Sequence, residues 1–121
     1  MVQSDVIKAY KALDSIKDTP MPVKIAYQLY KLKKVLETRW EFQVEQETKL
    51  AEKFHAIPLE GYRVKFENGD DMDGWNEAIK KLNDMEVNDI FFEPVKIPND
   101  VDIRVTPETM AALDGFVFMD I

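Results

Sequence analysis

The stretch PVKIAYQLYKLKKVLETRWEFQVEQETKLAEKFH, residues 22–55, decides the fold of this chain. It contains no glycine, and no proline after Pro22, which fits the first position of a helix because a missing N–H costs nothing there. Its apolar residues follow a helical period. Spacings of four, three, four, four and four residues separate Ile25, Leu29, Leu32, Leu36, Trp40 and Val44. We therefore predict one long helix over residues 22–55.

The predicted helix is longer than the domain that would contain it. Its 34 residues would extend about 50 Å at the usual rise of an α-helix. A domain of 121 residues has a radius of gyration of only about 13–14 Å. The helix must therefore bend, break near residues 40–42, or protrude and contact a partner. Tyr27, Tyr30, Val35 and Phe42 lie off the main stripe and give it a second, partly apolar face.

A shorter helix precedes the long one. Ser4 can cap it, and Asp5 favours its positive N-terminal end. Thr19-Pro20-Met21-Pro22 ends it, because proline lacks the N–H donor and restricts the residue before it. The first part of the chain is therefore predicted to be a helical hairpin. The apolar stripe of the first helix consists of Val6, Ala9, Tyr10, Leu13 and Ile16.

Residues 56–121 predict short strands and helices. Residues 62–66 and 101–105 alternate apolar with polar side chains, as half-buried strands do, and residues 87–97 contain a β-prone run. Asp73 can cap a helix over residues 74–84. Thr106-Pro107-Glu108 is a helix start, and Gly115 closes that helix. We predict an α+β fold: an N-terminal helical hairpin with one long helix, packed on a small antiparallel sheet with two short helices.

Length and charge indicate one domain with an acidic end. The chain has 121 residues, which suits a single domain over residues 1–121. Residues 1–55, the helical hairpin, carry ten basic and eight acidic side chains, a balance of +2. Residues 56–121, the acidic α+β part, carry six basic and fifteen acidic side chains, a balance of −9. No nucleic-acid partner is expected, because that function needs clustered Lys and Arg.

Composition excludes several kinds of chemistry. The chain has no Cys and one His, which excludes disulfide scaffolds, thiolate zinc sites, iron–sulfur ligation and a thiol nucleophile. His55 has no predicted nucleophile against it and fits a cation at a helix C-terminus. The acidic turn fails as a calcium loop, because Gly69 and Lys80 would stand where oxygen ligands are needed.

These exclusions predict a protein that is not an enzyme. We predict no catalytic residues, no cofactor and no metal site. A third hypothesis, a small hydrolase with a carboxylate pair, would need a concave pocket in which acidic side chains converge.

One basic cluster lies on the long helix. It comprises Lys31, Lys33, Lys34 and Arg39. Glu37 and Glu41 interleave with these residues at helical spacing, which is typical of a solvated helix face. A phosphate-contacting strip is the alternative interpretation.

Two surfaces are candidates for binding. Aromatic and Met residues beyond the needs of one core are typical of protein–protein interfaces. The candidate interface residues are Tyr27, Tyr30, Trp40, Phe42, Phe116, Phe118 and Met119. The candidate anionic surface comprises Asp70, Asp71, Asp73, Glu86 and Asp89. The first surface predicts a protein partner or self-association through the long helix.

No targeting feature is evident in the sequence. Residues 1–18 are polar and charged and lack the apolar core of a signal peptide. No apolar run approaches the roughly 20 residues that span a bilayer. We therefore expect an intracellular location and no membrane partner.

Several segments carry a resemblance to a known family. They are MPVKIAYQLYKLKKVLETRWEFQVEQETKLAEKF (21–54), the acidic Asn-Gly turn, WNEAIKKLNDMEVNDIFFEPVKI (75–97) and VTPETMAALDGFVF (105–118). Together they resemble a family of short uncharacterised proteins encoded by tailed bacteriophages and prophages, over roughly residues 10–118. The resemblance implies a phage context and a small α+β protein with a helical hairpin. It supplies no catalytic or ligand residues.

Two functional hypotheses follow. The first is a non-enzymatic phage-encoded protein that acts through protein–protein contacts, as a virion component or assembly factor. It would be located in the bacterial host cytoplasm or within the phage particle. The alternative is an acidic inhibitor of a host defence or DNA-binding protein, in which the negative half imitates a nucleic acid.

Overall fold

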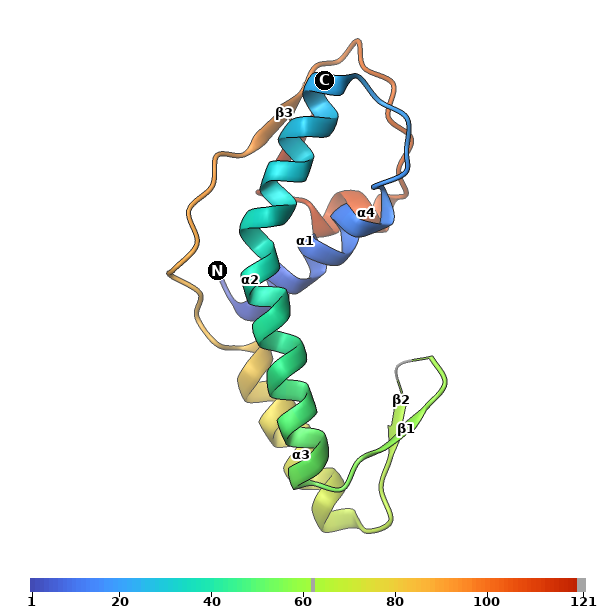
Figure 1. The fold of residues 1–121 in the computed structure, drawn as a ribbon, viewed down its shortest axis with the longest axis vertical. Coiled ribbons are helices and arrows are strands. Elements are labelled where there is room, and N and C mark those ends of the chain that lie inside the picture. Colours follow the sequence, from blue (N-terminus) through green and yellow to red (C-terminus); the bar gives the residue numbers. More distant parts are fainter. Residues whose placement is uncertain (62, 120–121) are drawn as a thin grey trace.

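The chain has the predicted α+β fold in a computed structural model that describes residues 1–61 and 63–119 (Figure 1). The elements follow in the order α1 (Gln3–Ser15), α2 (Val23–Lys53), β1 (Ile57–Leu59), β2 (Arg63–Lys65), α3 (Gly69–Asn83), β3 (Val95–Ile97), α4 (Pro107–Ala112) and β4 (Val117–Met119). The predicted helical hairpin is confirmed as α1 and α2.

Apolar side chains of α1 and of the first half of α2 form the centre of the core. Val6 and Leu13 of α1 are buried, as is Leu36 of α2. An ion pair at the surface joins the two helices, with Lys33 Nζ 2.7 Å from Asp14 Oδ1. Ser4 does not cap α1 as predicted: the cap position is Val2, whose N–H donates to Asp5 Oδ2 at 3.4 Å.

Helix α2 is continuous through residues 40–42, where a break was one of the predicted alternatives. Trp40 stacks on Tyr10 of α1 with ring centroids 5.2 Å apart, so this part of the helix packs on α1. At 31 residues α2 is about 46 Å long. Figure 1 shows it passing in front of α1 and continuing well beyond it, with α3 running back alongside its far end.

The predicted single antiparallel sheet is instead two separate two-stranded sheets. Strands β1 and β2 form an antiparallel hairpin, whereas β3 and β4 pair in parallel. The parallel pairing arises because α4 lies between the two strands in the chain, and a crossover of this kind returns the second strand in the same direction. Residues 101–105, predicted as a strand, pair with no strand in the described part of the chain; Val101, Ile103 and Val105 pack on the core without a ladder.

The two short helices were predicted with different accuracy. Thr106 caps α4 as predicted, and its Oγ1 accepts from the Thr109 N–H at 3.2 Å. Helix α3 begins five residues before the predicted start, because Asn68 and not Asp73 is its cap. The Asn68 side chain accepts from the Asp71 N–H at 2.8 Å. This start places Asp70 and Asp71 in the first turn, where the positive end of the helix favours acidic side chains.

Two regions can be distinguished along α2. We call residues 1–39 and 85–119 the body, and residues 40–61 and 63–84 the arm. The body contains nearly all of the buried side chains, whereas Gln43 and Leu82 are the buried ones among the described arm residues. The arm is held by half-buried aromatic rings, with the Phe66 and Trp75 centroids 5.9 Å apart.

A buried polar network joins the body to the arm. Gln3, fully buried in α1, donates through Nε2 to Gln43 Oε1 at 3.1 Å and to the Arg39 carbonyl at 3.0 Å. Arg39 Nε donates to Gln3 Oε1 at 2.8 Å. These bonds fix the N-terminal turn of α1 against α2 at the point where the arm begins.

Among the helices of the described residues, none is long and apolar enough to span a membrane.

Candidate functional site

The outward side of α2 is exposed along the whole helix. We define the α2 outer face as the exposed residues Val23, Tyr27, Tyr30, Lys34, Thr38, Glu41, Glu45, Thr48 and Glu52. They follow one another three or four residues apart, so they form one stripe opposite the buried stripe that contains Leu29 and Leu36. Helix α1, helix α3 and β3 pack on other sides of α2, which leaves this face uncovered in the described structure (Figure 1).

The first half of the α2 outer face is aromatic and basic. Tyr27 and Tyr30 are 59% and 55% exposed. Lys31 Nζ lies 5.0 Å from the Tyr27 ring centroid, and Lys34 Nζ lies 5.8 Å from the Tyr30 ring centroid. At these distances the lysine ammonium groups are attracted to the ring faces by cation–π interaction. Lys34 Nζ also donates to Glu37 at 3.1 Å, and this hydrogen bond raises the pKa of the Lys34 ammonium group.

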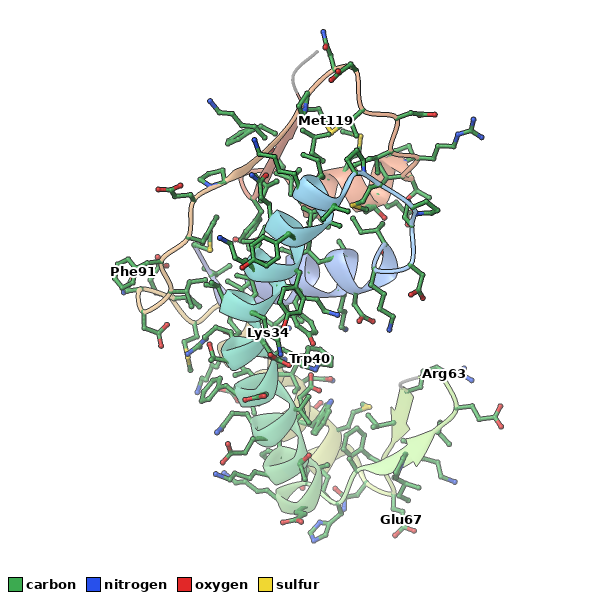
Figure 2. The ribbon with its side chains drawn as sticks, turned by 45° about the horizontal axis from the view of Figure 1, so that its top comes forward. Lys34, Trp40, Arg63, Glu67, Phe91 and Met119 are labelled. Atoms are coloured by element: carbon green, nitrogen blue, oxygen red, sulfur yellow. The ribbon has the colours of Figure 1, made fainter. Side chains whose placement is uncertain are left out.

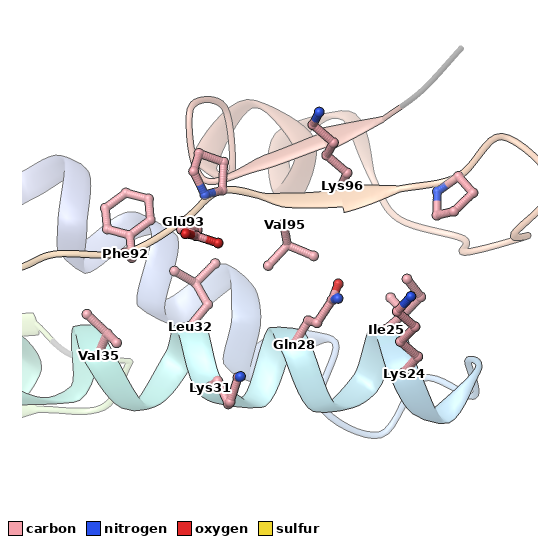
Figure 3. A pocket seen from close by; sticks show the side chains of 12 residues that line it. Lys24, Ile25, Gln28, Lys31, Leu32, Val35, Phe92, Glu93, Val95 and Lys96 are labelled. Carbon is pink, nitrogen blue, oxygen red and sulfur yellow. The ribbon is translucent and has the colours of Figure 1, made fainter.

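A groove of about 710 Å³ runs beside this face, between α2 and the chain around β3 (Figure 3). Leu32 of α2 and Val95 of β3 face each other across it, and Lys96 points away from α2 (Figure 3). Its remaining apolar lining includes Val35 and Phe92. Its charged rim comprises Lys24, Lys31, Glu93 and Lys96, so the groove is basic in a protein whose net charge is −7.

The free edge of β3 is poorly suited to pair with another strand. Val95 N–H donates to the Phe116 carbonyl at 3.0 Å, so the backbone groups of residues 95 and 97 point toward β4. Those of residues 94, 96 and 98 point away from β4, because backbone groups alternate along a strand. Pro94 and Pro98 have no N–H, and Lys96 alone offers a donor there. The groove therefore presents side chains to an occupant, not a sheet edge.

Phe91 is an interface candidate that the sequence did not identify. It is 85% exposed and projects from the loop between α3 and β3 (Figure 2). Its neighbour Phe92 lines the groove and stacks on Phe116 with centroids 5.0 Å apart. Successive side chains of an extended chain point to opposite sides, so one of two adjacent phenylalanines had to face outward. The sequence does contain a signal for this exposure. Ile90, Phe91 and Phe92 are three large apolar residues in a row, and an extended segment cannot turn all three toward the core.

The seven predicted interface residues lie in different environments. Tyr27 and Tyr30 are exposed on the α2 outer face, and Phe118 of β4 is exposed on the body. The prediction for Phe116 is wrong: its side chain is only 3% exposed and belongs to the core, where it stacks on Phe92. Trp40, Phe42 and Met119 are half-buried, with Trp40 against Tyr10 and the Arg39 guanidinium 4.5 Å from the Phe42 ring centroid.

The five predicted anionic residues lie at opposite ends of α3. Asp70, Asp71 and Asp73 belong to its first turns, whereas Glu86 and Asp89 follow its last turn, about 20 Å away along the helix axis. Glu86 Oε1 is 2.9 Å from the Met1 amino group, and Asp89 Oδ2 is 3.6 Å from Arg39 Nη1. The structure therefore brings together the first three residues but not all five.

His55 ends the long helix in a left-handed conformation, with a φ of 56°. Its Nδ1 lies 3.2 Å from Asp71 Oδ2, which joins the end of α2 to the start of α3. Within residues 1–61 and 63–119, no three His, Cys, Asp or Glu side chains converge as ligands of a metal ion would.

No protein-family model matches this chain, and comparisons with curated proteins and with solved structures give no significant match.

Proposed function

We propose that this chain is a non-enzymatic, phage-encoded protein that acts through protein–protein contacts, as a virion component or assembly factor. The phage context rests on the sequence resemblance, and the mode of action rests on the surface of α2. The protein would work in the bacterial host cytoplasm or within the phage particle.

The observation that carries the proposal is the pair of exposed tyrosines, Tyr27 and Tyr30, beside a basic groove with an apolar lining. Exposed tyrosines are typical anchors of protein interfaces, because they offer a large rigid contact area and a hydrogen-bonding hydroxyl. Phe91, at the loop that leads into the groove, adds a third exposed aromatic ring.

Site-specific photo-crosslinking in cells that produce the phage tests the proposal. A photoreactive amino acid at position 30 is expected to give a covalent adduct with a protein. The matched control is position 81 on α3, where Lys81 is exposed and pairs with Glu77 at 3.3 Å. Adducts at position 81 but not at position 30, or at neither, would contradict the proposal.

A further inference from the structure

We propose that the α2 outer face binds the same face of a second copy of this chain, with the two helices antiparallel. This inference rests on the proposed function and names the partner for that surface. It is carried by the distribution of charged and apolar side chains along one exposed helix face.

Charge is segregated along α2. Residues 23–39 carry five basic side chains and one acidic side chain, whereas residues 40–53 carry two basic and four acidic ones. On the outer face the change is from Lys34, flanked by Lys31, to Glu41 and Glu45. A parallel pair of such helices would place like charges together. An antiparallel pair places the basic half of each copy against the acidic half of the other, which complementary interfaces require.

The position of the two-fold axis follows from these residues. Lys34 and Glu41 are seven residues apart, so they are equidistant from a point between residues 37 and 38. A two-fold axis at this point, beside the short side chain of Thr38, puts each Lys34 opposite the Glu41 of the second copy. It also puts each Tyr30 opposite Glu45. Such an interface is isologous and closes with two copies.

The same two-fold axis also brings exposed apolar side chains of the two copies together. The large exposed hydrophobic residues of α2 are Val23, Tyr27, Tyr30 and Val44, so the second half contributes only one. The two-fold axis near Thr38 brings Val44 of one copy level with residue 31 of the other along the helix axis, on the flank where Tyr30 lies. Each Val44 would then be covered by the aromatic end of the opposite helix, and both ends of the contact would bury apolar surface.

Charge reversal with mixing tests the pairing. The variant K31E/K34E and the variant E41K/E45K each place like charges opposite one another, so each alone should associate at least about tenfold more weakly than the wild type. A mixture of the two variants should form a one-to-one heterodimer, because positions 31, 34, 41 and 45 are then all acidic in one copy and all basic in the other. Sedimentation velocity gives the masses, and circular dichroism verifies that each variant is folded.

The matched control is K80E/K81E on α3, which makes the same change in net charge and also removes an exposed ion pair. It should associate as the wild type does. Wild-type association should weaken as salt rises, because exposed charges are screened over about 10 Å at 0.1 M ionic strength. Equal weakening by the control, or a mixture that stays monomeric, would overturn the inference.

A second measurement does not depend on charge. The chain has no cysteine, so T38C and T48C each introduce a single thiol. Under mild oxidation T38C should form an intermolecular disulfide, because residue 38 lies beside the two-fold axis, whereas the two copies of residue 48 would be about 30 Å apart. Equal disulfide formation by both variants would indicate parallel pairing or random collision and would overturn the inference.

The inference and the proposed function can fail separately. A wild-type protein that stays monomeric at low salt, and yet gives adducts with another protein at position 30, would overturn self-pairing and leave the proposed function standing. The absence of both self-association and adducts would contradict both.

Discussion

The body and the arm share helix α2 but are stabilised in different ways. In the body, α2 presents Leu29, Leu32 and Leu36 to a core completed by α1, β3, β4 and α4. In the arm, the same helix packs mainly on α3, with α1 touching only its first turn through Tyr10 and Gln3, and its buried residue is the polar Gln43. Helical periodicity alone therefore does not show how much core a helix segment buries. That amount depends on how many elements surround the segment.

The largest expected effect distinguishes the two regions directly. Leu36→Ala should lower the free energy of unfolding by about 2–5 kcal/mol, because Leu36 is fully buried and the change leaves a cavity. Leu50→Ala, at a half-buried position of the arm, should cost less than half as much. Denaturant unfolding measures both. Equal losses would show that the arm contributes as much core as the body.

The junction between the regions is tested by Gln3→Met, which keeps the volume and removes the polar atoms. It leaves Gln43 Oε1 and Arg39 Nε without the partner they have in α1, which should cost about 1–3 kcal/mol of unfolding free energy. The control Gln28→Met, at a half-buried position in the groove, should change stability by less than about 0.5 kcal/mol. Equal losses of unfolding free energy in Gln3→Met and Gln28→Met would show that the buried hydrogen bonds do not stabilise the junction.

The packing of the arm is tested by Gly74→Ala in α3. A Cβ there would lie 2.3 Å from Phe54 Cε1 and 2.9 Å from Phe54 Cδ1, so the Phe54 ring would have to move. The overpacking should outweigh the gain in helix propensity and leave a loss of about 1–2 kcal/mol. Gly69→Ala, where no atom lies within 4 Å of the new Cβ, should not destabilise. Thermal unfolding of the two variants decides, and a stabilised Gly74→Ala would contradict the described packing.

The smallest expected effect concerns the surface of the body. The hydrogen bond from Lys33 lowers the pKa of Asp14 below its ordinary value of 3.8. The pair therefore stabilises the fold above that value, and its contribution is lost as the pH falls through the folded pKa. Asp14→Asn should cost less than about 1 kcal/mol at neutral pH, because the Asp14 side chain is half exposed. A difference from wild type that persists unchanged in acid would contradict this assignment.

The sequence alone predicted those parts of the structure that depend on residues close together in the chain. The long helix could be predicted because its period and the absence of breakers act locally, and Thr106-Pro107-Glu108 could be predicted because a cap acts within one turn. The start of α3 was missed because residues 68–73 offer several possible caps in succession.

The sequence alone did not predict burial that depends on contacts between segments far apart in the chain. The sequence alone did not show that Phe116 is buried, because its partner Phe92 lies far away in the chain. The parallel pairing of β3 with β4 has the same cause. Of the candidate site, Tyr27 and Tyr30 could be identified from the helical period, but the groove and the exposure of Phe91 required the fold.

The central claim is that the α2 outer face becomes covered when the protein associates. Hydroxyl-radical footprinting of the wild-type protein, at low and at high concentration in low salt, tests it most directly. Modification of Tyr27 and Tyr30 should fall as the concentration rises, while that of Phe118, exposed on the body, stays constant. Unchanged reactivity of both tyrosines in a sample that has associated would contradict the account.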